Sequence, residues 1–135
     1  MGLFGNNAEK DAKKAAENQA LHDVRDRLAA LPLVDLAEET VRTIFTGEGR
    51  GAESGGCGQG LITKHWDPTE SFFGIDDSAR NELDAIIREG LQVAEHACLV
   101  RWEVSGGDTT SVTLKLTRVG HQALLDGTVR QLLGG

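Results

Sequence analysis

The sequence predicts an α+β fold that is mostly helical, and three patterns in its later part support that prediction. Apolar residues recur at three- and four-residue steps between Asp76 and Ala97, the spacing of one face of an α-helix. The segments CLVRWEV and SVTLKLT (residues 98–104 and 111–117) then alternate apolar and polar side chains, as half-buried strands do. A last apolar stripe follows Thr117. We therefore expect a long helix, a β-hairpin and a further helix in direct succession.

The long helix expected over residues 76–97 has a clear start signal and one unfavourable position. Asp76 and Asp77 stand where an N-cap and a first-turn acid favour the unpaired N–H groups and positive dipole of a helix start. Gly90 interrupts the apolar face, and a mid-helix glycine costs about 1 kcal/mol relative to alanine. Gly90 therefore indicates either a close crossing with another helix or a break into two helices. The apolar face consists of Ala79, Leu83, Ile86, Ile87, Gly90, Ala94 and Ala97.

The register of the hairpin follows from the apolar side of each strand. A slip of one residue would turn a whole strand over, so both apolar sides can face the core in only one alignment. That alignment has an odd-numbered loop centred on Asp108, and it predicts that Trp102 is buried against Leu114. The pairs that it requires are Val100 with Leu116, Trp102 with Leu114, and Val104 with Val112.

Short motifs at the two ends of the hairpin carry a resemblance to a known family. The dipeptide Leu99-Val100 begins the first strand, and Leu116-Thr117-Arg118-Val119-Gly120 joins the second strand to the last helix. These motifs resemble the end of a bacterial winged helix-turn-helix domain, in which a recognition helix leads into a leucine-valine strand, a wing hairpin and an L-T-x-x-G segment. The resemblance covers about the last third of the chain. It implies a winged-helix-like domain. Independently of the resemblance, residue type and position mark Thr117 as the N-cap of the last helix and Gly127 as its stop.

The domain organisation predicted from the sequence has an extra N-terminal helix. Residues 1–32 form a helical arm that ends near Pro32, and residues 33–135 form the winged-helix-like domain. The first half of the arm has no apolar face and is expected to project. The second half carries a stripe at steps of three, four and three residues: Leu21, Val24, Leu28 and Leu31. This stripe either docks on the chain's own domain or forms the seam of a homodimer.

The middle of the chain predicts one helix and leaves its remaining structure open. Apolar residues within 33–45 have the spacing of an amphipathic helix, and residues 47–60 are expected to form a glycine-rich loop. The second helix that the resemblance requires belongs within residues 60–73. There, residues 61–66 form either a short edge strand or a stub helix, and Pro68 is suited to the first turn of a helix.

Composition and motifs argue against a membrane protein and against an enzyme. A net charge of −7, a mean hydropathy of −0.27 and the lack of a long apolar run argue against a membrane span. The 2 cysteines at unrelated positions indicate a reducing, cytoplasmic location. The glycine-rich loop lacks the Lys and Ser/Thr of a phosphate-binding loop. The adjacent Glu38 and Glu39 show no sign of the burial that would shift a catalytic pKa.

Two chemical uses of Cys57 have weak support. As a nucleophile it needs a fixed base among His65, His96 and His121, which a flexible glycine loop cannot hold. As a zinc ligand it would act with His65, His96 and Cys98, but the one-residue gap in His96-x-Cys98 is shorter than that of paired ligands. We therefore expect no catalytic residue, no cofactor and no metal.

Aromatic residues gather in one stretch of the chain. The chain has 2 tryptophans and 4 phenylalanines. Half of these aromatic residues, Trp66, Phe72 and Phe73, fall within one short segment. They either cap the core, as large aromatic side chains mostly do, or form a surface patch for a partner.

Charge separates the two functions that the resemblance leaves open. Arg and Gln on a recognition helix can read base edges while wing cations contact phosphates. However, residues 33–135 hold 9 Lys and Arg against 16 Asp and Glu, a net charge of −7 that repels nucleic acid. We therefore predict a non-enzymatic winged-helix module for protein–protein interaction or regulation, with a DNA-binding transcriptional regulator as the alternative. The candidate partner-binding residues are Arg80, Asp84, Arg88, Gln92, Trp66, Phe72, Phe73, Arg101 and Lys115.

Overall fold

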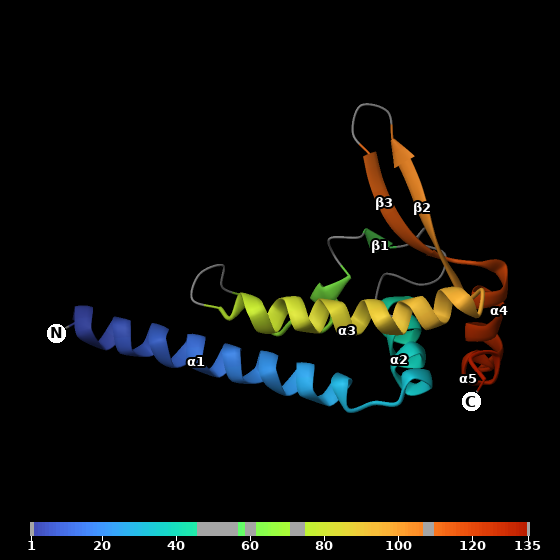
Figure 1. Cartoon of the computed structure of the whole chain (residues 1–135). Helices are drawn as coiled ribbons and strands as arrows, with labels where there is room; N and C mark the ends of the chain where they lie inside the picture. Colours follow the sequence, from blue (N-terminus) through green and yellow to red (C-terminus); the bar gives the residue numbers. More distant parts are fainter. Residues whose placement is uncertain (1, 46–56, 59–61, 71–74, 107–109, 135) are drawn as a thin grey trace.

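Helix α3 (Asp77–His96) is the central element of the computed structural model, and the other elements pack along it and at its ends (Figure 1). The structure describes residues 2–45, 57–58, 62–70, 75–106 and 110–134. The expected α+β, mostly helical fold is confirmed. The other elements are α1 (Gly2–Ala29), α2 (Leu33–Phe45), β1 (Cys57–Gly58), the 3-10 helix η3 (Thr63–His65), β2 (Val100–Gly106), β3 (Thr110–Leu116), α4 (Arg118–Asp126) and α5 (Val129–Leu132).

Helices α2 and α3 cross at Gly90, where the lack of a side chain lets the two helices approach closely. A Cβ atom at Gly90 would lie 2.9 Å from Cγ of Leu36 and 3.0 Å from Cγ2 of Thr40. Helix α3 continues without interruption through this position. Of the two alternatives for Gly90, the close crossing is therefore correct. Leu83 and Ile87, on the same face of α3, are fully buried.

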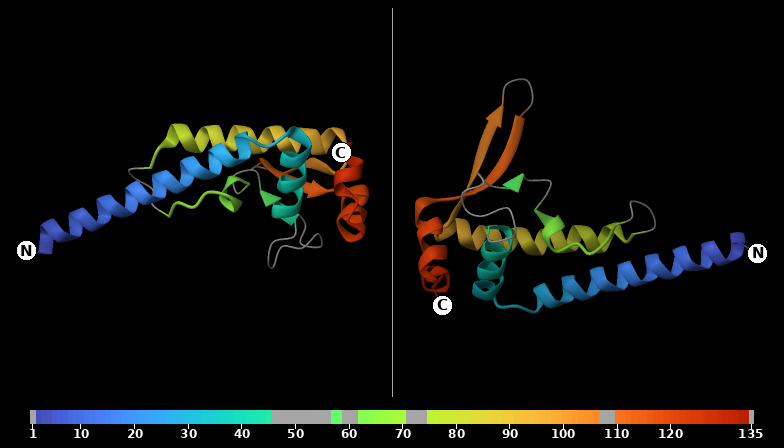
Figure 2. Two further views of the ribbon diagram at one scale, coloured as in Figure 1. Left: turned by 90° about the horizontal axis from the view of Figure 1, so that it is seen from below. Right: turned by 180° about the vertical axis from the view of Figure 1, so that it is seen from behind.

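Helix α1 lies beside α3 in its second half and extends past the start of α3 in its first half (Figures 1 and 2). Leu21 and Leu28 are 0% exposed and belong to the same core cluster as the buried residues of α3. A ring nitrogen of His22 lies 2.9 Å from Oδ2 of Asp76, the N-cap of α3. The apolar stripe therefore docks on the chain's own domain, the first of its two alternatives. It could form a homodimer seam only if α1 left α3.

The register of the hairpin is the one deduced from the sequence. Strands β2 and β3 pair with Trp102 opposite Leu114, and the flanking pairs also match. Residues 107–109, where the expected loop lies, are outside the described residues. The structure adds a third strand, because Cys57 and Gly58 pair with the other edge of β3, in the order β1-β3-β2. The expectation that residues 47–60 form a loop throughout is thus wrong at these two positions.

The core covers only the base of the hairpin, which rises away from the C-terminal end of α3 (Figure 1). Val100 and Leu114 are fully buried, whereas Trp102 is half-buried and Val104 is 66% exposed. Trp102 is therefore less buried than expected. The expectation that Val104 faces the core is wrong. Alternation places both residues on the same side of the strand, but that side extends beyond the packed helices.

A set of contacts around the Leu99 carbonyl joins α3, the hairpin and α4. The carbonyl oxygen of Leu99 accepts a hydrogen bond from the backbone N–H of Thr117 at 3.0 Å. The Thr117 side chain, as the expected N-cap of α4, accepts from the backbone N–H of Gly120 at 2.9 Å. A Cβ atom at Gly120 would lie 2.0 Å from the Leu99 oxygen, so no larger residue fits without movement. Gly127, in the left-handed conformation (φ 71°), ends α4 as expected.

Residues 62–70, the described part of the segment before α3, form less helix than the sequence suggested. Of the alternatives for residues 61–66, the stub helix is found, as the single turn η3, and Leu61 lies outside the described residues. The suggested helix from Pro68 is wrong for residues 68–70, which have no regular structure. The turn chemistry of Asp67 explains this, because its Oδ1 accepts hydrogen bonds from the backbone N–H of Thr69 at 2.8 Å and from its hydroxyl at 2.6 Å.

Replacing Gly90 by alanine tests the close crossing. Alanine favours an isolated helix by about 1 kcal/mol over glycine. Here its Cβ would collide with Leu36 and Thr40, so Gly90→Ala should instead lower the free energy of unfolding by about 1–3 kcal/mol, the range for an overpacked core. Denaturant unfolding measures the change. The control Asn81→Ala, at an exposed position of α3, should be neutral or stabilising, and a stabilised Gly90→Ala variant would contradict the crossing.

Candidate partner-binding site

Arg80 of α3 is held by the segment that precedes the helix. Its Nε donates to Oδ2 of Asp67 at 2.9 Å, and its Nη2 donates to the Thr69 hydroxyl at 2.5 Å. The Asp67 side chain is only 12% exposed, so the guanidinium neutralises a carboxylate that solvent reaches poorly. Arg80 therefore stabilises residues 67–69 against α3, rather than extending freely into solvent.

Arg88 is held in a second arrangement, between a carboxylate and an aromatic ring. Its Nε lies 2.8 Å from Oδ2 of Asp84, one turn earlier on α3. Its guanidinium carbon lies 5.8 Å from the ring centroid of Trp102, within the range of a cation–π contact. Asp84 also accepts a hydrogen bond from the Thr63 hydroxyl of η3. Two predicted partner-binding residues, Arg88 and Asp84, thus bind each other.

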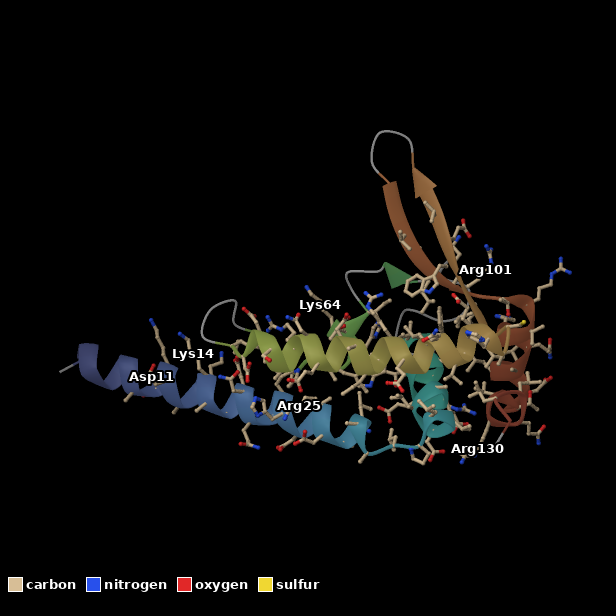
Figure 3. The ribbon with its side chains drawn as sticks, viewed as in Figure 1. Asp11, Lys14, Arg25, Lys64, Arg101 and Arg130 are labelled. Carbon is tan, nitrogen blue, oxygen red and sulfur yellow. The ribbon has the colours of Figure 1, made fainter. Side chains whose placement is uncertain are left out.

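The two basic side chains of the hairpin share one carboxylate. Nη2 of Arg101 lies 3.2 Å from Oε2 of Glu103, and Nζ of Lys115 also lies 3.2 Å from that oxygen. Alternation along the strands places these three residues on the side of the hairpin opposite Trp102. Figure 3 shows Arg101 beside the base of the hairpin.

These ion pairs leave an acidic surface on α3. All four basic residues that the sequence proposed for DNA contact (Arg80, Arg88, Arg101 and Lys115) lie within 4 Å of a carboxylate of the same chain. The exposed acidic residues of α3 are Asp77, Glu82, Glu89 and Glu95. Of these, Asp77 lies 3.8 Å from Arg80, and Glu82 lies 3.4 Å from Arg25 of α1. Within the described part of the chain, Glu89 and Glu95 form no ion pair. A partner approaching this helix therefore meets negative charge.

A groove of about 460 Å³ lies between α3 and the hairpin. We call it the α3–hairpin groove, and its lining residues are Arg88, Leu91, Gln92, Glu95, Trp102 and Val112. Leu91 is buried at its base, Trp102 and Val112 are half-buried, and Gln92 and Glu95 are exposed. The groove brings together the predicted residues Arg88 and Gln92, whereas Arg80, Arg101 and Lys115 are outside its lining.

Sequence reasoning missed Trp102, Leu91, Glu95 and Val112 as residues of a candidate site. Trp102 and Val112 were assigned to the core because they alternate with polar neighbours. One feature of the sequence could have indicated the site. Only a short connection separates the helix of Arg88 from the strand of Trp102, so the strand must begin beside the helix end. That feature does not reveal how far the hairpin rises above the core.

The aromatic candidates are not part of the groove. Trp66 is 8% exposed and belongs to the core cluster, so of its two alternatives the structure shows the core position. Its indole N–H donates to Oε2 of Glu39 at 3.0 Å. Phe72 and Phe73 lie outside the described residues.

Glu39 is a structural carboxylate that is partly buried, although the sequence showed no sign of its burial. Arg27 of α1 donates to both of its oxygens, at 2.9 and 3.0 Å. These hydrogen bonds lower the pKa of Glu39 against the opposing effect of burial, and the Trp66 indole lowers this pKa further. Glu39 is therefore ionised near neutral pH, the state opposite to that of a proton donor. It lines a second hollow of about 550 Å³ between α1 and α2, together with Arg27, Leu31, Asp35, Glu38, Arg42 and Thr43.

Other classes of site find no support in the part of the chain that the structure describes. No three His, Cys, Asp or Glu side chains there gather as a metal site would require. No described helix combines the length and apolar character needed to cross a bilayer. Comparison of the chain with protein-family models, curated proteins and solved structures finds no match.

The lowered pKa of Glu39 predicts an acid-sensitive contribution to stability. Because the folded carboxylate binds its proton less readily than the unfolded one, its contribution is present above the ordinary glutamate range and is lost as the pH falls through the lowered folded pKa. Glu39→Gln should lower the free energy of unfolding by about 1 kcal/mol at neutral pH, as a partly exposed ion pair allows. The difference from wild type should vanish in acid, well below about pH 4.

Denaturant unfolding across pH measures this difference. Glu9→Gln, on the projecting half of α1, removes the same charge at an exposed position and should not change stability. Equal stability of wild type and Glu39→Gln at neutral pH would contradict the assigned role.

Proposed function

We propose that this chain is a non-enzymatic winged-helix-like module that binds a protein partner, as an interaction or regulatory adaptor. Three features support the winged-helix-like part of the proposal. The order of elements from α2 through η3 and α3 to the hairpin follows the order that the resemblance requires. The single 3-10 turn η3 lies within residues 60–73, the segment where a second helix is required. The contacts of Thr117 and Gly120 explain why threonine and glycine occupy their positions in the L-T-x-x-G segment.

The single observation that supports a protein partner over DNA is the neutralisation of the four basic side chains that the sequence proposed for DNA contact. Phosphate contacts by Lys and Arg supply much of the affinity of DNA-binding proteins. In this chain Arg80, Arg88, Arg101 and Lys115 each pair with a carboxylate, and such pairs would have to break or reorient for phosphate binding. The exposed Glu82, Glu89 and Glu95 of α3 would repel a duplex in addition.

The same acidic surface favours a protein that carries basic residues. Complementary potentials across an interface speed association and exclude partners of the wrong charge. The chain's net charge of −7 acts in the same direction. A partner with exposed Lys or Arg residues therefore meets an attractive potential at α3, where nucleic acid meets a repulsive one.

One observation favours the alternative of a DNA-binding transcriptional regulator. Arg88 and Gln92 lie one helical turn apart on α3 and line the same groove. Both residue types can form bidentate hydrogen bonds with base edges. For this function the Arg88 side chain would have to leave its ion pair with Asp84 and its contact with the Trp102 ring in order to reach a DNA base.

A gel shift against genomic DNA fragments distinguishes the two functions. At about 50 mM salt, where attraction to phosphates is strong, we expect no retarded band for the wild-type chain. Glu103→Gln sharpens the test, because it releases Arg101 and Lys115 from their shared carboxylate. Under the DNA alternative this variant should bind more tightly than wild type. A retarded, salt-sensitive band that is lost in Arg88→Ala would overturn the proposed function.

A pull-down provides the positive half of the test. We expect a protein captured from a nuclease-treated lysate to be lost when Glu82, Glu89 and Glu95 are together changed to Gln. The matched control changes three distant exposed acids, Glu9, Asp11 and Asp126, to their amides. Equal loss in both variants would show that only net charge matters, and would contradict binding at α3.

A further inference from the structure

We propose that the α3–hairpin groove is the docking site for a basic protein segment that inserts an apolar side chain against Trp102. This inference rests on the proposed function and assigns it a location and a partner chemistry. It depends on three observations: an apolar floor, an aromatic ring already held in place, and an exposed acid on the rim.

The floor of the groove continues as an apolar strip along the hairpin. Leu91 forms its buried base, with Trp102 and Val112 half-buried beside it. Val104, which is 66% exposed, pairs with Val112 and lies on the same side of β2 as Trp102. Apolar side chains that continue from a groove onto an exposed strand are typical of an interaction surface. A segment lying along this strip would cover Leu91 and bury the exposed parts of Trp102, Val112 and Val104.

Trp102 is held in the position of a binding residue before any partner arrives. The Arg88 guanidinium lies 5.8 Å from its ring centroid, and Asp84 holds Arg88 from the other side. A ring that is already restrained loses little conformational entropy on binding. Half-exposed tryptophans in such pockets are frequent energetic centres of protein interfaces.

The charges around the groove select a basic segment. Asp84 neutralises Arg88, while Glu95 on the rim is exposed. Arg101 and Lys115 lie on the opposite side of the hairpin and so do not offset the charge of Glu95. A Lys or Arg next to the inserted apolar side chain would find Glu95 at the rim. Nucleic acid, with its phosphates, would find no such match.

The chain contains an internal control for the test, because its 2 tryptophans lie in different surroundings. The Trp66 indole N–H is bound to Glu39 in the core, whereas Trp102 lines the groove. The two indole N–H signals can be followed separately by NMR, and the one that disappears in Trp102→Phe belongs to Trp102. The probe is a short amphipathic peptide of Lys and Leu residues, titrated into the full chain.

We expect the peptide to shift the Trp102 indole signal and to leave the Trp66 signal in place. Two matched peptides, one with Ser for every Leu and one with Glu for every Lys, should not shift it. Trp102→Ala should weaken binding by about tenfold or more, as the loss of a central aromatic contact does. Glu95→Gln, which keeps the fold, should weaken it by about twofold to fivefold, as expected for a rim charge. Glu9→Gln should leave binding unchanged.

Each contrary result has a definite meaning. An unmoved Trp102 signal, or shifts confined to residues outside the groove, would overturn the docking site. The protein-binding function would survive that outcome if the pull-down still depended on Glu82, Glu89 and Glu95. A Trp102 shift caused by duplex DNA in place of the peptide would overturn both proposals.

Discussion

The carbonyl oxygen of Leu99 is the point on which the arrangement of the candidate site depends. It lies between the end of α3 and the start of β2, accepts the backbone N–H of Thr117 from the end of β3, and packs against Gly120 of α4. One oxygen thus joins a helix, both strands and the following helix. Cys98, just before it, adopts a positive φ of 63°, which turns the chain sharply out of α3. Together these contacts set the angle between α3 and the hairpin, and therefore the width of the groove.

The crossing of α2 and α3 at Gly90 supports this arrangement from the other side of the helix. Helices α1 and α2 pack against α3 and bury its apolar face. The hairpin finds support only at its base, where Val100 and Leu114 enter the core. Its upper part keeps an apolar side without a neighbour in the described structure. The exposed strip is thus a consequence of how the helices share the surface of α3.

The ion pairs have a structural and an electrostatic consequence at once. Arg80 holds the segment around Asp67 against α3, and Asp84 joins η3 to the same helix through Thr63. Partly shielded pairs of this kind hold both partners in defined positions. The basic side chains that carry out this packing are no longer available as free positive charge. The acidic residues outside these pairs then determine the potential that a partner meets.

Local patterns in the sequence predicted the elements well. The spacing of apolar residues indicated α3, the side-chain alternation determined the strand register, and Asp76, Thr117 and Gly127 marked helix ends. These features depend on neighbours within a few residues, which is why a sequence shows them directly. Of the helix sought within residues 60–73, the described residues 62–70 contain one turn, because Asp67 and Thr69 form a competing local turn. Strand β1 escaped prediction because two residues in a glycine-rich stretch carry no periodic signal.

The sequence by itself determined the four longer helices α1 to α4, the hairpin and its register, the acidic character of the domain, and the choice of Arg88 and Gln92 as surface residues. Only the tertiary structure decided that Asp67 neutralises Arg80, since the two lie 13 residues apart and no local pattern links them. It also decided that the stripe of α1 docks on α3 and that Trp102 lines a groove. Alternation tells which side of a strand a residue faces, but the depth of burial depends on how far the neighbouring helices reach.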